Sequence, residues 1–121
     1  MNAINWFEIP VSDLDRAVKF YNRILSANMQ VIEMGDAKMA MLPSQMPGVG
    51  GALVRQPGHK PGVDGARVYL NGGENLEGTL NRIESAGGKV LVKKTKVTEE
   101  IGYWAMFQDS EGNHIALHSP K

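Results

Sequence analysis

The chain has 121 residues, of which 42% are hydrophobic, and its 13 basic and 13 acidic side chains leave no formal net charge at pH 7. This length suits a single domain whose core buries about two thirds of the unfolded chain's surface. The balanced charge gives no reason to expect a nucleic acid or an anionic membrane as a partner. Because the chain has no cysteine, disulfides, thiolate metal ligands and thiol nucleophiles are excluded.

The first residues show no basic region followed by an apolar run, and no segment approaches the roughly 20 apolar residues that cross a bilayer. We therefore expect a cytoplasmic protein that makes no membrane contact.

In the first half of the chain, apolar residues alternate over residues 6–11, which predicts a strand with one apolar face. Ser12 and Asp13 can cap a helix whose apolar residues recur every three or four positions from Leu14 to Leu25. Runs that favour strands follow at residues 29–34, 38–42 and 51–55. This order is βαβββ. Residues 56–65 contain two prolines and three glycines and read as a linker.

The second half repeats this order, with its first strand and helix sixty-two positions after those of the first half. We predict strands at residues 67–71, 89–97, 103–108 and 114–118, and one helix capped by Asn75 and ended by Gly87 and Gly88. The sequence therefore predicts a single α+β domain over residues 1–121. It consists of two βαβββ modules, residues 1–55 and 66–121, joined by the linker 56–65.

Two motifs carry a family resemblance. Residues 8–14 read Glu-Ile-Pro-Val-Ser-Asp-Leu with Phe20 and Tyr21 near the end of the helix, and residues 109–115 read Asp-Ser-Glu-Gly-Asn-His-Ile. Together they resemble the vicinal oxygen chelate superfamily, which includes glyoxalase I, bleomycin-resistance proteins, fosfomycin-resistance enzymes and extradiol dioxygenases. The resemblance covers nearly the whole chain. It implies curled mixed sheets that form a cup, with helices on the outside and a small organic ligand inside, usually beside a divalent metal.

The resemblance also implies where metal ligands would lie, in the first and last strands of each module. Carried over to this chain, these positions fall on Trp6, Val68 and Ala116, and the fourth falls within residues 50–54. None of these residues offers a carboxylate, imidazole or amide, and divalent metals need several such donors. We therefore predict a cup without a metal ion or another cofactor.

Residues two apart on a strand share a face, so Glu8 should point into the cup with Trp6, and His114 and His118 should do so with Ala116. A carboxylate on an apolar strand is a candidate general base, and His118 would then polarise a substrate oxygen. The alternatives are that Glu8 lies at a wet cup mouth or pairs with Arg67 or His118, and that Trp6 plugs the cup. The predicted ligand-binding residues are Trp6, Glu8, Met39, Met41, Val68, Leu70, Trp104, Met106, His114, Ala116 and His118, of which Glu8 and His118 are also the candidate catalytic residues.

Three functions remain open at this point. The favoured one is a metal-free protein that binds a small organic molecule, because bleomycin-resistance proteins belong to the family that the chain resembles. The second is a glyoxalase-like lyase or isomerase that uses Glu8 as its base. The third is a dimeric scaffold whose cup is filled by its own side chains. We also expect a homodimer, since a small two-module sheet commonly needs further cover.

Overall fold

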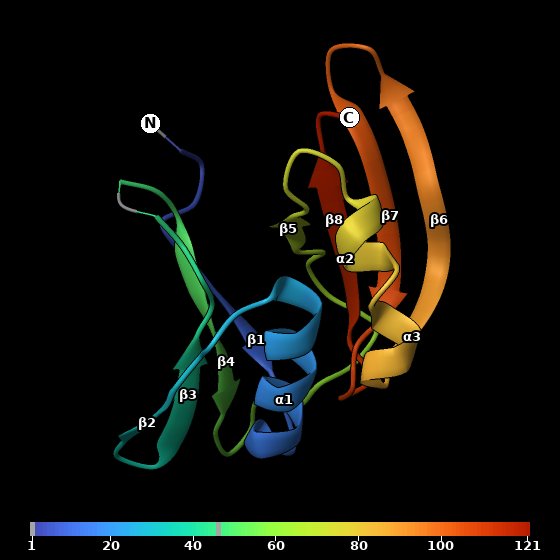
Figure 1. The fold of residues 1–121 in the computed structure, drawn as a ribbon. Helices are drawn as coiled ribbons and strands as arrows, with labels where there is room; N and C mark the ends of the chain where they lie inside the picture. Colours follow the sequence, from blue (N-terminus) through green and yellow to red (C-terminus); the bar gives the residue numbers. More distant parts are fainter. Residues whose placement is uncertain (1, 46) are drawn as a thin grey trace.

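The computed structural model describes residues 2–45 and 47–121, which form two modules with a four-stranded mixed sheet each (Figure 1). The first sheet has the order β1-β4-β3-β2, and the second has the order β5-β8-β7-β6. In each sheet the first strand runs parallel to the last, and the remaining pairs are antiparallel. The predicted fold class is thus confirmed. The strands are β1 (Trp6–Pro10), β2 (Val31–Met34), β3 (Ala37–Met41), β4 (Gly50–Arg55), β5 (Tyr69–Asn71), β6 (Lys89–Thr98), β7 (Gly102–Gln108) and β8 (His114–Ser119).

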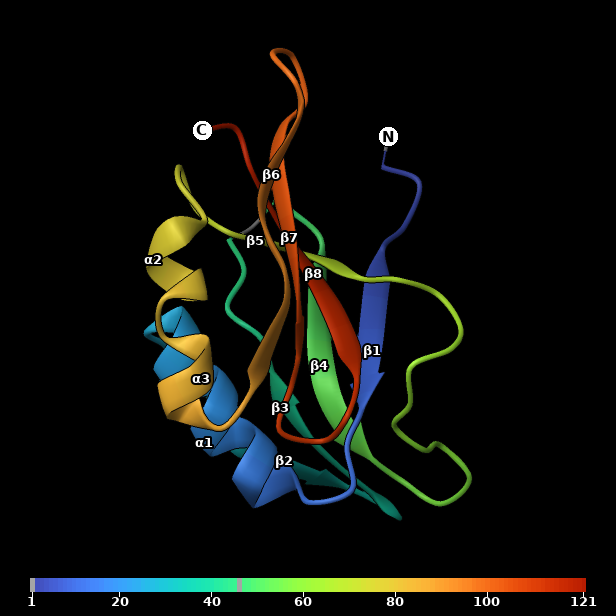
Figure 2. The ribbon, with the colours of Figure 1, turned by 90° about the vertical axis from the view of Figure 1, so that its right-hand side faces the viewer.

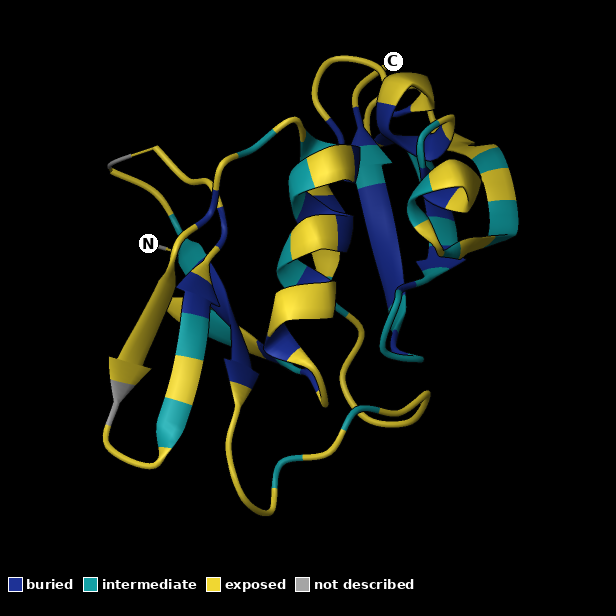
Figure 3. Cartoon of the chain, turned by 60° about the horizontal axis from the view of Figure 1, so that its bottom comes forward, coloured by how far each residue is buried: buried dark blue, intermediate teal, exposed yellow. Residues whose placement is uncertain are grey.

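The helix α1 (Leu14–Leu25) matches the sequence prediction at both ends. Asp13 caps it by accepting a hydrogen bond from the backbone N–H of Arg16 at 3.0 Å. Its buried residues form one stripe, and Figure 3 shows exposed residues along one side of the helix and buried ones along the other. All three helices lie on the same side of the two sheets (Figure 2).

The single helix predicted for the second module is wrong, because the structure has two short helices, α2 (Glu77–Leu80) and α3 (Ile83–Ala86). At the break, the backbone N–H of Arg82 bonds to the carbonyl of Thr79, only three residues back. The Arg82 guanidinium meanwhile donates two hydrogen bonds, of 3.1 and 2.8 Å, to the carbonyl of Ile24 at the end of α1. This contact between modules accompanies a break in a segment that also contains the weak helix former Gly78.

One hydrophobic core joins the two modules. It contains residues from α1 and from both sheets, and the rings of Phe20, Tyr21 and Phe107 meet in it with centroids 5.0 to 6.4 Å apart. The core fills the side of the sheets that carries the helices, which leaves the opposite sheet faces open. No helix in the described ranges is long and apolar enough to span a membrane.

The strand register corrects the spacing of the repeat. Pro10 pairs with Val54 in the first sheet, and Asn71 pairs with His118 in the second, so Pro10 corresponds to Asn71. The strands thus repeat sixty-one positions apart, whereas the helices begin sixty-three positions apart, at Leu14 and Glu77. Three residues separate β1 from α1 and five separate β5 from α2, so the second module has two extra residues between its first strand and its helix. The expected spacing of sixty-two is therefore one too many for the strands and one too few for the helices.

Candidate functional site

The open faces of the two sheets carry most of the residues predicted to line the cup. Trp104, Met106 and Gln108 of β7 pair with His118, Ala116 and His114 of β8, so these side chains share one face. The intervening residues of both strands belong to the core. The same alternation puts Trp6 and Glu8 of β1, and Met39 and Met41 of β3, on the open face of the first sheet.

The face of β5 on which Val68 and Leu70 lie is a correction to this prediction. Leu70 is 7% exposed and belongs to the core, and Val68 packs against the core, so both side chains lie on the helix side, where they line a groove between the two modules. Because the first strands repeat sixty-one positions apart and not sixty-two, the open face of β5 carries Tyr69 and Asn71. Arg67 takes the place in the second module that Trp6 holds in the first. The signal that could have revealed this is the longer segment between strand and helix.

Two adjoining grooves meet along the residues Tyr69, Leu70 and Asn71. One, the Trp104 groove, has a volume of about 870 Å³ and lies over the second sheet. The other, the Trp6 groove, has a volume of about 820 Å³ and lies where the two modules meet. The Trp104 groove is further lined by Val97, Ile101, Trp104, His118 and Pro120. The Trp6 groove is further lined by Ile4, Trp6, Phe7, Leu25, Leu42, Pro43, Val49, Gly50, Gly51, Ala66, Arg67, Val68 and Gly73.

Aromatic rings and one cation form a connected surface in these grooves. The rings of Tyr69 and Trp104 lie 6.3 Å apart at an angle of 49°, and the Arg67 guanidinium carbon lies 5.8 Å from the centroid of Trp104. Trp6 is 42% exposed and Tyr69 is 52% exposed, although large apolar side chains usually bury more of their surface. A flat, apolar molecule would find stacking surfaces here.

His118 contributes a polar atom to the Trp104 groove. Its Nε2 lies 2.6 Å from the carbonyl oxygen of Ile101. Because a carbonyl only accepts, Nε2 carries the hydrogen, and Nδ1 of the neutral ring is then an acceptor.

Glu8 lies on the expected sheet face beside Trp6, but it lines neither groove. Its side chain is exposed, accepts a hydrogen bond from Nε1 of Trp6 at 3.2 Å, and makes no ion pair with Arg67 or His118 among the described residues. Glu8 lines a third cavity of about 210 Å³ together with His114, beneath the linker. Glu8 and His118 thus border different cavities, and the exposure of Glu8 agrees with the alternative of a solvated position at the cup mouth.

The three methionines and Ala116 lie outside the stacking surface. Met39 and Met106 are half-buried, Met41 is 48% exposed, and none of them lines either groove. Ala116 is fully buried between the strands that carry Tyr69 and Met106.

The residues at the implied metal positions do not fit a divalent metal. In the register of the strands these positions are Trp6, Ala52, Arg67 and Ala116, since Ala52 pairs with Glu8 as Ala116 pairs with Tyr69. None of the four side chains is a metal ligand. In the part of the chain that the structure describes, no group of three or more His, Asp or Glu residues is arranged to hold a metal ion.

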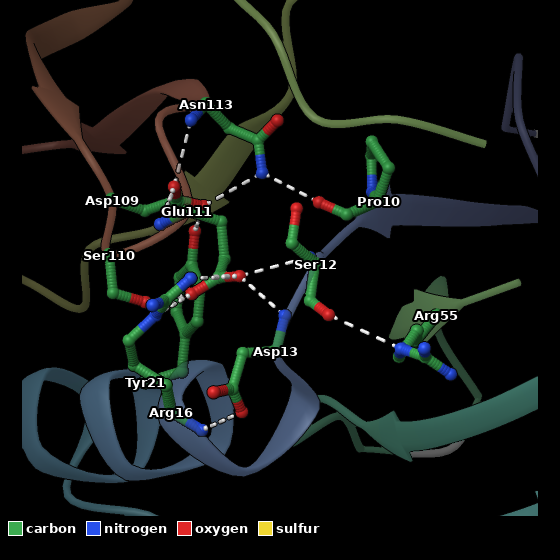
Figure 4. Close-up of polar contacts among 10 residues, drawn as sticks. All are labelled: Pro10, Ser12, Asp13, Arg16, Tyr21, Arg55, Asp109, Ser110, Glu111 and Asn113. Carbon is green, nitrogen blue, oxygen red and sulfur yellow. Dashed lines mark hydrogen bonds and ion pairs between the residues drawn. The ribbon is translucent and has the colours of Figure 1, made fainter.

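The turn between β7 and β8 holds a polar network that the sequence motif did not explain (Figure 4). The Glu111 side chain is fully buried and accepts the backbone N–H groups of Ser12 and Asp13, at 2.9 and 2.8 Å, where α1 begins. It also pairs with Arg16 through Nε and Nη2, at 2.7 and 3.0 Å. Burial acts to raise the pKa of Glu111, but the hydrogen bonds from Arg16, Asp13, Ser12 and Ser110 outweigh it and hold the pKa below its ordinary value.

Asp109 lies beside Glu111 and is 2% exposed. It accepts the hydroxyl of Tyr21 at 2.7 Å, the backbone N–H of Asn113 at 2.8 Å and the side-chain amide of Asn113 at 3.0 Å. Burial, followed by the charge of Asp109, raises the pKa of Tyr21 well above its usual value. Asn113 in turn donates to the carbonyl of Pro10 and accepts the N–H of Gly62 in the linker. The motif therefore joins the two modules and lies apart from the grooves.

Comparisons with known proteins agree with this architecture. Residues 3–117 match the family described as the Glyoxalase/Bleomycin resistance protein/Dioxygenase superfamily. A glyoxylase-like domain-containing protein from Didymella fabae is 27% identical over 119 residues, which cover 94% of this chain and 91% of that protein.

Solved structures show the same fold. TnmS3, an antibiotic binding protein from Streptomyces sp. CB03234, is 25% identical with a TM-score of 0.66, over 100% of this chain and 98% of that one. A glyoxalase I mutant from Zea mays is 20% identical with a TM-score of 0.70. That likeness covers 95% of this chain but 46% of the maize chain, so this protein spans about half its length.

Proposed function

Because the chain belongs to the Glyoxalase/Bleomycin resistance protein/Dioxygenase superfamily, we propose that it binds a small, flat, largely apolar organic molecule without the help of a metal ion. The observation that carries this proposal is the set of aromatic rings that borders the two adjoining grooves, namely the exposed rings of Trp6 and Tyr69 and the half-buried ring of Trp104. Pockets for small molecules typically combine such apolar walls with a few polar groups, a role that Asn71 and His118 fill here.

The likeness to an antibiotic binding protein supports the same function. Binding alone can protect a cell from a toxic aromatic compound, because a sequestered molecule no longer reaches its target. Such a role requires affinity and a shaped groove, and it requires no reacting group. We therefore propose sequestration of the compound as the role of this chain.

The two other functions have less support. A lyase or isomerase that uses Glu8 as its base needs a second group to stabilise the enolate, a task worth several kcal/mol when a metal performs it. Glu8 and His118 line different cavities, so the geometry does not offer this pair. A scaffold with a self-filled cup is disfavoured by open grooves of about 870 and 820 Å³.

Binding is tested with naphthalene-2-carboxamide, a flat and uncharged probe. The chain has two tryptophans, and each borders one groove, so the two indole N–H signals in a nitrogen–proton NMR spectrum report on the grooves separately. We expect the probe to shift at least the Trp104 signal. Trp104→Ala should weaken binding about tenfold, since stacking on an aromatic side chain contributes about 1 to 3 kcal/mol.

The control is Val63→Ala, which removes an exposed apolar side chain that lines neither groove and should leave the affinity unchanged. Trp104→Phe and Trp6→Phe assign the two signals. If neither signal moves at probe concentrations up to about 1 mM, a weak affinity by any standard, the proposed function is wrong.

We also propose that two copies of the chain associate. The edge strand β2 exposes Val31 and Ile32, at 44% and 42%, and one side of this strand pairs with no other strand of the described residues. Such an edge favours pairing with another chain. We expect light scattering to give a mass near twice 13.2 kDa at micromolar concentration. Ile32→Lys should shift that mass toward a single chain, and a wild-type mass near 13.2 kDa would refute the pairing.

A further inference from the structure

Positive charge exceeds negative charge among the residues that line the two grooves. Among the described residues that line them, Arg67 is the only one with a permanent charge, and no aspartate or glutamate is present. The chain as a whole has 13 acidic side chains, so their absence from both linings leaves a local excess of positive charge in a neutral protein. A ligand with a negative charge would meet attraction here, and no carboxylate within either lining repels it.

Arg67 is positioned to use that charge. Its guanidinium lies over the ring of Trp104, at 5.8 Å from the centroid. Stacking occupies the flat face of a guanidinium and leaves its N–H groups directed outward along the edges, where they can bind a carboxylate through two parallel hydrogen bonds. Within residues 2–45 and 47–121, the guanidinium of Arg67 makes no ion pair and donates no hydrogen bond that would compete.

Glu8 places a negative charge on β1, beside Trp6. Its carboxylate holds the indole N–H of Trp6 and borders the third cavity, not the grooves. A ligand whose acidic group points toward Glu8 would be repelled, whereas the opposite orientation brings that group to Arg67. Charge therefore favours one direction of the ligand along the Trp6 groove.

Resting on the proposed function, we infer that the ligand is an aromatic acid whose ring stacks beside Tyr69 and Trp104 and whose carboxylate binds Arg67. The two aromatic rings and the stacked guanidinium together form one binding site for an aromatic ring that carries an acidic group.

The test compares three probes of the same shape: naphthalene-2-carboxylate, naphthalene-2-carboxamide and 2-naphthylmethylammonium. Calorimetric titration of the wild-type protein should show the carboxylate binding about tenfold or more tighter than the amide, and the ammonium binding most weakly. Arg67→Gln should reduce the affinity for the carboxylate to that for the amide. The affinity for the amide should change by less than about threefold.

The matched control is Arg23→Gln on α1, an exposed residue outside both grooves that undergoes the same change of charge. It should keep the preference for the carboxylate. Because Arg67 is exposed, its variant should fold, and the NMR spectrum checks this directly.

The outcomes separate the two proposals. If the wild-type protein binds amide and carboxylate equally, or if Arg67→Gln weakens both to the same extent, the inference about the acid is overturned while the proposed function stands. If none of the probes binds, the grooves do not take flat aromatic molecules, and the proposed function falls. If probe binding is lost as the chain associates at high protein concentration, a second copy occupies the grooves, which overturns both.

Discussion

Replacing Asp109 with alanine should lower the free energy of unfolding by about 3 to 5 kcal/mol, a large part of the stability of a typical domain. The carboxylate is buried and accepts hydrogen bonds from Tyr21, Asn113 and the backbone of Glu111. Without it, a buried hydroxyl and several N–H groups lose their partner, and each such group costs about 1 to 3 kcal/mol. Urea denaturation followed by circular dichroism measures the loss.

Two further variants provide comparisons for Asp109→Ala. Asp36→Ala removes an exposed carboxylate in the turn between β2 and β3 and should change stability by less than about 0.5 kcal/mol. Tyr21→Phe removes only the hydroxyl that bonds to Asp109, so it should cost about 1 to 2 kcal/mol, and the double variant should cost less than the sum. If Asp109→Ala lowers the free energy of unfolding by less than about 1 kcal/mol, the turn between β7 and β8 does not hold the two modules together.

Glu111 should make the stability of the protein depend on pH in the acid range. Its pKa in the folded chain lies below the ordinary value of 4.5, so the folded state binds a proton less readily than the unfolded state does. The stabilisation is therefore complete above about pH 4.5 and is lost as the pH falls through the lower, folded pKa. At pH 7, Glu111→Gln should cost about 1.5 to 3 kcal/mol, mostly from the buried bonds to the backbone, because the partner Arg16 is largely exposed.

The measurement is the melting temperature of both proteins between pH 3 and pH 7. The wild type should lose stability toward the acid end more steeply than Glu111→Gln, so the two curves converge there. Glu84→Gln, which changes an exposed glutamate of α3, should run parallel to the wild type. A Glu111→Gln curve that is also parallel to the wild type would show that this carboxylate does not carry the acid sensitivity.

Local sequence signals were enough to predict most of the fold. The apolar stripe and the Asp13 cap specify α1, and alternation with turn residues specifies the strands to within two residues. The break in the second helix could not be predicted in this way, because Arg82 reaches the end of α1 through tertiary contact. The roles of Asp109 and Glu111 are hidden for the same reason, since their partners lie about 90 or more positions away.

The candidate site was predictable only in part. Strand alternation led to Trp6, Trp104 and His118, which the structure places on the grooves. It also led to Leu70, which lines the grooves from the helix side of β5 and not from the expected face, because no local pattern marks the strand spacing of sixty-one. Tyr69 and Arg67 were missed for that reason.

The side chains at equivalent positions of the two modules break the internal symmetry of the cup. Two related modules would, if identical, offer a bound molecule two equivalent ends, and the molecule could enter in either of two reversed poses. Here the two equivalent positions hold an indole ring at Trp6 and a cation at Arg67, and both border the same groove. The two ends of the cup therefore differ in chemistry. A molecule with one polar end and one apolar end can be held in a single pose. A molecule with identical ends leaves either Trp6 or Arg67 without a matching group.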